Sequence, residues 1–327
     1  MTVDLVIQSI FSALFIASVI RISTPIIFPA LGGLIASLSG ASNMALEGLM
    51  LVGALTGVMV SAFTGSVWFA VFCGVVAGIA IAWVLAFFHL RMKSDLFIAG
   101  LAINLLCSAG TIFILFVITG EKGNSSTLPS LSVPNIHIPF IKDIPFLGIV
   151  LSGHSVFTYL AFILTYFVYI FLYRTSYGTQ LRAVGENPEA ATSLGINVKR
   201  VRMTALMISG AFAALGGMNL SMAYLQLFQR DMSAGRGWIG LASVYLGAYK
   251  PLGTMLAAIL FGFSDAVANQ FASLDIPSHL VQTIPYVTTV VALLVYAIQQ
   301  KQAILERIKK YQRENPDQLA EKTAKSE

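Results

Sequence analysis

Two carboxylates, Glu47 and Asp265, lie within stretches of sequence that are otherwise apolar. If such a stretch crosses a membrane, an ionised side chain at its centre costs about 3 kcal/mol on insertion scales, so an acidic residue there is usually functional, for example in lining a solute path. Glu47 also has a structural interpretation. Asn43 could cap a helix whose positive end would favour Glu47 in its first turn. Both roles remain open for Glu47.

Amide side chains accompany these acids. Asn104 lies in an apolar stretch, where it needs a hydrogen-bond partner and could either face a solute path or join two helices. Asp265 and Asn269 are four residues apart and would therefore share one face of a helix. Such a polar stripe favours contact with protein or with a water-filled path over contact with lipid. The predicted path residues are therefore Asn43, Glu47, Asn104, Asp265 and Asn269.

Motifs for enzyme chemistry are missing from the sequence. It contains no Gly-x-x-x-x-Gly-Lys-Ser/Thr loop for nucleotide phosphates, so the chain is not expected to hydrolyse ATP. The His-Glu-x-x-His and Gly-x-Ser-x-Gly patterns are absent as well. The four histidines are widely separated, which argues against a metal site. We therefore predict a non-catalytic chain with no cofactor or metal of its own.

The composition indicates a membrane protein. Of the 327 residues, 57% are hydrophobic and only 11% are charged, whereas soluble domains carry about 25% charged residues. The net charge of +5 does not indicate nucleic-acid binding, because the cations gather in loops and in the tail rather than on one surface. Most of the chain is expected to contact membrane lipid or other apolar segments.

Ten apolar stretches approach the length of about 20 residues that a membrane helix requires. They are residues 5–20, 25–39, 44–63, 67–89, 95–119, 153–173, 204–226, 238–249, 252–271 and 281–298. Ten crossings place both termini on one side. With the termini in the cytoplasm, 15 of the 20 Lys and Arg residues fall inside, as the positive-inside rule requires. The other five fall in the predicted outer connections: Arg21, Lys122, Lys142, Arg230 and Arg236. The sequence thus predicts an all-α, multi-pass domain over residues 1–300 and a cytoplasmic tail over residues 301–327.

The longest predicted external loop covers residues 120–152. Four prolines recur through it, so it should be extended and irregular. Its apolar pieces could lie on the membrane surface or meet an external partner, or the loop could form a lid that contacts neither.

The two halves of the chain resemble each other weakly. Residues 40–53 and 233–247 are both rich in small residues, and each follows or interrupts a short apolar run. Short, glycine-interrupted segments at corresponding places in two halves indicate a transport path built from discontinuous helices. In the predicted topology the first begins inside and the second outside, as an inverted repeat requires.

The polar stretch 177–203 contains a predicted short helix, and residues typical of a helix start and a helix end mark both of its boundaries. Asn187 suits the N-cap, Pro188 the first helical position and Glu189 the positive helix end. Gly195 can end the helix in a left-handed conformation. Because cations flank this helix, the loop is expected in the cytoplasm, where a capped helix more often serves for docking than as a mere connector.

This stretch and a second one resemble a known family. Residues 181–196, Leu-Arg-Ala-Val-Gly-Glu-Asn-Pro-Glu-Ala-Ala-Thr-Ser-Leu-Gly-Ile, look like the cytoplasmic coupling segment of importer permeases of the ATP-binding-cassette (ABC) class, in the branch for simple sugars, nucleosides and branched-chain amino acids. Residues 43–54 are similar to the Asn-x-x-x-Glu-Gly-x-x-Leu-x-Gly-Ala pattern of the nucleoside-type members. The Asp-Leu-Ser-Val-Gly-like stretch of ribose-type members is absent, which favours nucleosides over simple sugars.

The resemblance covers nearly the whole chain and implies a fold like that of the vitamin B12-type importers, in a bacterial inner membrane. It also implies three partners: a second permease subunit of a different sequence, a cytoplasmic ATPase that binds ATP and Mg²⁺, and an external substrate-binding lipoprotein or periplasmic protein. The residues implied in coupling to the ATPase are Arg182, Gly185, Glu186, Asn187, Pro188, Glu189, Ala190 and Gly195. Two alternatives remain: a sugar permease of the same class, and a proton-coupled secondary transporter that uses Glu47 or Asp265 as a relay.

Overall fold

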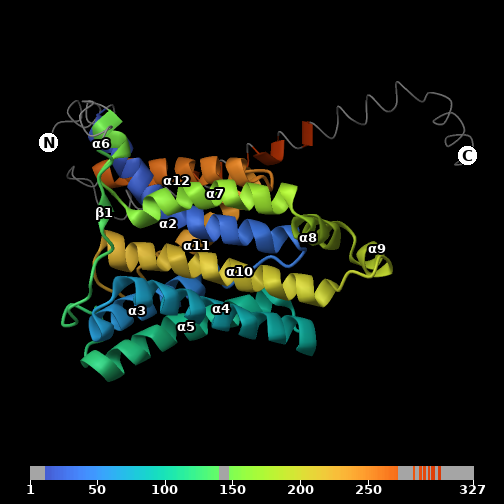
Figure 1. Ribbon diagram of the computed structural model, residues 1–327, viewed down its shortest axis with the longest axis horizontal. Helices are drawn as coiled ribbons and strands as arrows, with labels where there is room; N and C mark the ends of the chain where they lie inside the picture. The colour runs from blue at the N-terminus through green and yellow to red at the C-terminus, as the bar shows by residue number, and fades with distance from the viewer. Residues whose placement is uncertain are drawn as a thin grey trace, which may run out of the picture.

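The computed structural model describes residues 12–139 and 147–271, together with the isolated positions 283, 287–288, 290–291, 294, 296–298 and 301–302. The described part is helical except for loops and one two-stranded ribbon (Figure 1). Its elements are α2 (Ala13–Leu38), α3 (Leu46–Thr64), α4 (Val67–Met92), α5 (Leu96–Thr119), β1 (Asn135–Ile136), α6 (Leu147–Leu151), β2 (His154–Ser155), α7 (Val156–Arg174), α8 (Ser176–Glu186), α9 (Pro188–Ser193), α10 (Val198–Met218), the π-helix η1 (Asn219–Tyr224), α11 (Arg236–Leu246) and α12 (Pro251–Phe271).

Seven helices in the described residues are long and apolar enough to cross a membrane. They are α2, α3, α4, α5, α7, the continuous rod of α10 and η1, and α12. The prediction of a multi-pass helical protein is therefore confirmed, and six of the predicted stretches correspond to single helices. Half of the predicted stretch 281–298, and all of the tail except residues 301–302, lie outside the described residues.

The prediction of two separate stretches, 5–20 and 25–39, is wrong for the described residues. One continuous helix, α2, runs from Ala13 to Leu38 through the expected break. The hydroxyls of Ser23 and Thr24 donate to backbone carbonyls four residues before them, at 2.7 and 2.8 Å, so they are satisfied within the helix. Pro25 and Pro29 are tolerated inside it because neighbouring helices surround this part of α2. The prediction that the N-terminus lies in the cytoplasm concerns residues 1–11, which are outside the described part.

The predicted stretch 238–249 also differs from the structure. The corresponding helix, α11, has only 11 residues and is too short to cross a membrane. It begins at Arg236, inside the bundle, rather than at an outer surface.

Helix α2 occupies the centre of the bundle. It packs against α7, α10, α11 and α12, and its residues 22–36 are all buried. Helix α10 in turn packs against α3 and α4, while α5 lies at one edge against α3 and α4 (Figure 1). Large apolar side chains of α5 such as Leu105 and Phe113 are exposed on the outside, as a lipid-facing helix requires.

The two ends of the bundle differ. Helices α8 and α9 project from one end, and β1 and α6 lie at the other (Figure 1). In the described part of the 120–152 segment, residues 120–139 are irregular except for β1, as predicted, but residues 147–151 form the short helix α6, which the prediction of an irregular loop did not include. Ser125 exchanges hydrogen bonds with Phe228 at 2.8 Å, which fastens this segment to the loop after η1.

Candidate functional site: two internal helix starts, a projecting helix and an outer cavity

Helices α3 and α11 both begin inside the bundle, and their starts meet at Glu47. The two carboxylate oxygens of Glu47 accept hydrogen bonds from the backbone N–H groups of Gly235 and Gly237, each at 2.7 Å. The first N–H groups of a helix have no partner within the helix, and its positive end favours an anion. Glu47 therefore caps α11 although it belongs to α3.

The close approach depends on glycine at the start of α11. A Cβ atom at Gly237 would lie 2.6 Å from the backbone nitrogen of Glu47 and 2.7 Å from its Oε2 atom. Gly235, the N-cap of α11, has a φ of 80° in the left-handed region. The small residues of 233–247 thus allow two discontinuous helices to touch.

Asn104 of α5 does for α3 what Glu47 does for α11. Its Oδ1 atom accepts the N–H of Gly48 at 2.8 Å, and its Nδ2 atom donates to the carbonyl of Met44 at 2.7 Å. Gly48 lies in the first turn of α3, so its N–H is one of the groups that the helix itself leaves unsatisfied. Of the two roles open for Asn104, the structure supports the bond between helices.

The predicted helix cap at Asn43 is wrong. The N-cap of α3 is Ala45, whose side chain makes no capping hydrogen bond. Asn43 is instead fully buried, accepts the N–H of Ala45 at 2.9 Å and donates to Ser209 of α10 at 3.0 Å. The helix starts later than predicted because Asn104 supplies the acceptor at its first turn. Glu47 does occupy that first turn, as predicted.

Asp265 forms an ion pair with Arg236, the first residue of α11. The distance is 3.7 Å, and the side chains are only 13% and 21% exposed. The prediction of Arg236 in a loop is wrong, because Arg236 is the first residue of α11 and its side chain is largely buried against α12. Asn269, one turn further along α12, is exposed. Glu47 and Asp265 thus meet at the start of α11, whereas Asn43 bonds to α10 and Asn269 lies apart from them on α12.

The projecting helix α9 has the predicted structure. Asn187 Oδ1 accepts the N–H groups of Glu189 and Ala190 at 3.1 and 3.0 Å, and Pro188 is the first helical residue. Gly195 follows with a φ of 81°. Leu194 lies at the tip and is 79% exposed, an unusual position for a large apolar side chain outside a membrane.

Helix α8 links α9 to the bundle. A side chain at Gly185 would collide with the carbonyl of Leu38, so α8 lies directly on the end of α2. Arg202 of α10 donates to the carbonyl of Ser39 at 3.2 Å, and Arg182 stacks over the ring of Tyr173 at 4.8 Å. All eight predicted coupling residues are gathered in α8, α9 and the turn after α9.

A groove of about 1050 Å³ separates α9 from the end of α4. Cationic and polar side chains line it, among them His89, Lys93, Glu189, Lys199 and Arg202. This groove leaves the face of α9 that carries Glu189 and Thr192 accessible.

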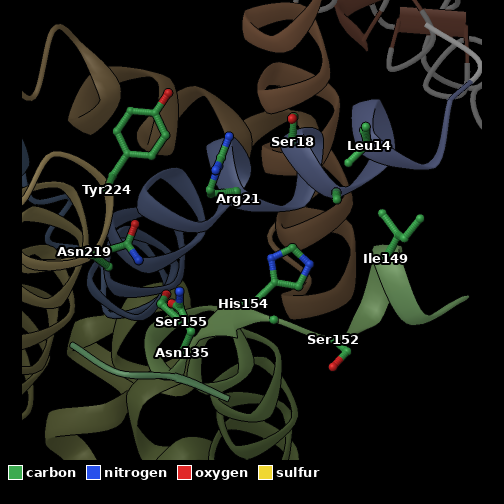
Figure 2. A pocket seen from close by; sticks show the side chains of 13 residues that line it. Leu14, Ser18, Arg21, Asn135, Ile149, Ser152, His154, Ser155, Asn219 and Tyr224 are labelled. Carbon is green, nitrogen blue, oxygen red and sulfur yellow. The ribbon is translucent and has the colours of Figure 1, made fainter. Parts of the chain in front are cut away.

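A cavity at the opposite end was not anticipated. It has a volume of about 280 Å³ and lies between the N-terminal part of α2, η1 and the β1–β2 ribbon (Figure 2). The guanidinium of Arg21 stands 5.5 Å from the centre of the Tyr224 ring. The sequence predicts Arg21 in a loop between two helices, whereas in the structure Arg21 belongs to α2 and lines this cavity.

The fold and these sites define a multi-pass membrane protein whose apolar bundle contains internal helix starts. Residues 15–298 match the family model described as branched-chain amino acid transport system / permease component, and the chain belongs to this family. It is therefore a transport subunit of the permease class, as the resemblance in its sequence indicated.

Three relatives match over most of their length. The chain is 32% identical to the putative glucose ABC transporter permease protein TsgC13 of Haloferax volcanii, with 90% of this chain and 94% of the relative covered. It is 33% identical to the guanosine ABC transporter permease protein NupQ of Bacillus subtilis, with coverage of 83% and 88%. It is 30% identical to the nucleoside ABC transporter permease protein NupC of Lactococcus lactis, with coverage of 86% and 92%.

Proposed function

We propose that this chain is a membrane-spanning subunit of an ABC importer and forms part of the translocation path for nucleosides. The observation that carries the proposal is α9, a self-capped helix that projects from the bundle in a chain without a phosphate-binding loop. Two of the three relatives are named as guanosine or nucleoside permeases, and residues 43–54 carry the nucleoside-type pattern. A separate ATPase would bind ATP and Mg²⁺.

The proposed orientation places α8 and α9 in the cytoplasm. Cations gather at that end, namely Arg91, Lys93, Arg174, Arg182, Lys199, Arg200 and Arg202. Lys122 and Arg230 are at the other end, in segments that bond to each other. This asymmetry agrees with the positive-inside rule. The predicted bacterial inner membrane and the cytoplasmic tail are part of the same proposal.

The contacts suggest how a push on α9 would reach the middle of the membrane. Closure of the ATPase would move α9 and α8 as one unit against the end of α2 at Leu38. Further along α2, Gly33 faces Leu46 and Val244, which belong to α3 and α11. A rigid shift of α2 would therefore act on the junction of the two internal helix starts. A partner can shift an equilibrium between two conformations only if it binds them with different free energies. The ATPase must therefore contact α9 in both conformations of the permease, with different contacts in each.

The path residues have a defined place in this mechanism. Glu47, Asn104 and Asp265 hold the internal ends of α3 and α11 through capping bonds and an ion pair. If these bonds broke and re-formed with other partners, the path between the two halves of the chain would open or close. We propose that a second permease subunit of different sequence completes the path, and that an external binding protein delivers the solute to the end with β1 and α6.

The test is uptake by the whole complex in proteoliposomes that contain this chain, a second permease, the ATPase and the binding protein. Tritiated guanosine, adenosine, uridine and glucose are supplied outside, and ATP on the side of α9. The expected result is ATP-dependent accumulation of nucleosides that is lost without the ATPase. Accumulation of glucose alone would establish the sugar alternative, which the relative TsgC13 represents. Uptake driven by a proton gradient without the ATPase would contradict the proposed class of transporter.

A further inference from the structure

The cavity between α2, η1 and the β1–β2 ribbon contains a buried polar side chain that lacks a hydrogen bond. Asn219 is only 4% exposed, and its amide group has no hydrogen-bond partner among the described residues. Buried amides are normally paired, so an unpaired one that lines a cavity points to a ligand or to water as its partner. The cavity of about 280 Å³ approaches the size of small-molecule sites, which begin at roughly 300 Å³.

The π-helix η1 shapes this cavity. The N–H of Leu225 donates to the carbonyl of Leu220 at 2.9 Å, five residues before it. In an α-helix, residues five positions apart point about 140° away from each other. In a π-helix the same residues are about one turn apart, so Asn219 and Tyr224 both line the cavity (Figure 2). Such local π-helices are often found at functional sites.

Arg21 provides an unpaired cation at the same place. It is the ninth residue of α2 and lies about 12 Å along that helix from its start. Among the described residues, no carboxylate pairs with it, and its guanidinium stacks with Tyr224. An aromatic ring and a guanidinium plane are the two surfaces on which proteins stack nucleobases.

The remaining walls offer hydrogen bonds to a hydroxylated solute. His154 Nε2 lies 2.8 Å from the carbonyl of Val150 and therefore donates its proton there, which leaves Nδ1 as the ring nitrogen for a bond to the solute. Ser18 and Asn135 add a hydroxyl and a second amide. Among the described residues that line the cavity none is acidic, which disfavours a cationic ligand.

We propose that this cavity binds the nucleoside on its way into the path, with the base stacked at Arg21 and Tyr224 and the ribose hydrogen-bonded by Asn219 and its neighbours. The proposal rests on the proposed function and names the residues that recognise the solute. A nucleoside has a planar base and a hydroxylated ring, so it can use both ends of the cavity at once. A single sugar ring can use only one.

The first experiment measures nucleoside uptake by the reconstituted complex carrying Tyr224→Leu or Asn219→Ala. The KM for guanosine rises at least about fivefold in Tyr224→Leu, as expected for a lost base–aromatic contact, while the maximal rate stays close to that of the wild type. Tyr166→Leu is the matched control, because Tyr166 is 64% exposed on α7 and does not line the cavity. Its KM stays unchanged.

The second experiment measures binding without transport. Ser18→Cys is labelled from outside with a membrane-impermeant maleimide in the complex without ATP, and the parent chain with Cys73 and Cys107 gives the background. Guanosine slows labelling of Ser18→Cys, whereas glucose does not. If the wild type takes up nucleosides but both variants keep their KM and guanosine gives no protection, the cavity proposal is overturned and the proposed function stands. If the wild type takes up no nucleoside, or if glucose alone protects Ser18→Cys, the nucleoside assignment fails with it.

Discussion

The internal starts of α3 and α11 and the start of α9 all have free backbone N–H groups, but these groups find their hydrogen-bond partners in opposite ways. At the junction of α3 and α11, the free N–H groups are satisfied by Asn104 and Glu47, which come from other helices. At α9, Asn187 satisfies them from the adjacent position in the chain. A helix capped by distant residues depends on the whole bundle, whereas a helix capped by its own neighbour can move as a unit. The comparison therefore separates a part that stabilises the bundle from a part that is free to transmit motion.

The largest effect on transport is expected from Gly195→Val. A β-branched residue is strained at a φ of 81°, so the turn after α9 would change direction. Uptake falls to background and the ATPase loses its dependence on substrate, while the apparent melting temperature of the complex stays near the wild-type value. Thr192→Ala, on the same helix, is the control. A drop in melting temperature equal to that of a core variant would mean that α9 is a structural element of the bundle.

Asp265→Ala tests the part of the molecule that depends on the whole bundle, namely the internal start of α11. It leaves Arg236 buried without its partner, and breaking a buried pair in this way costs about 3–5 kcal/mol. The apparent melting temperature and the uptake fall together. The double variant with Arg236→Met recovers most of the lost thermal stability, because it removes the uncompensated charge. Unchanged stability of Asp265→Ala would show that the pair at 3.7 Å contributes little.

Glu47→Gln gives a smaller loss of stability. Glutamine has one acceptor oxygen instead of two, so one N–H at the start of α11 loses its partner at a cost of about 1–3 kcal/mol. We expect a lower melting temperature and reduced uptake with normal membrane insertion. Glu121→Gln, outside the junction, is the control. If uptake falls while the melting temperature is unchanged, Glu47 acts on the solute rather than as a cap.

The smallest effect is expected from Asn187→Ala. Loss of an N-cap side chain costs about 1 kcal/mol, and here that cost falls on α9 alone. Uptake decreases by less than about tenfold, the factor that corresponds to 1.4 kcal/mol, and Asn187→Ser restores it. The melting temperature of the complex does not change. Equal uptake by the alanine and serine variants at the wild-type rate would show that the order of α9 is unimportant for coupling.

The same contrast explains what the sequence could predict. The bounds of α9 follow from Asn187, Pro188 and Gly195, which are adjacent in the chain, and six membrane helices follow from runs of apolar residues. The partners of Glu47 and Asp265 lie 188 and 29 residues away in the chain, at Gly235 and Arg236. Pairing over such distances is decided by the packing of the bundle and leaves no local pattern.

Two errors have a related cause. The sequence predicts a break at Arg21 between two apolar runs, although the hydroxyls of Ser23 and Thr24 bond back within α2 and the helix continues. The outer position of Arg236 came from assuming that each connection stays at a surface. The cavity at Asn219 was missed because a π-helical segment has the same composition as an α-helix.

The most direct test of the account is the position and contact of α9 in the working complex. Ser193→Cys lies on α9 and can be joined to nearby cysteines by a short bifunctional reagent in the assembled transporter. We predict that it cross-links to the ATPase with a yield that changes between ATP-bound and nucleotide-free states, and that an impermeant maleimide added outside cells does not reach it. Labelling from outside, or cross-linking to the external binding protein instead of the ATPase, would contradict the account.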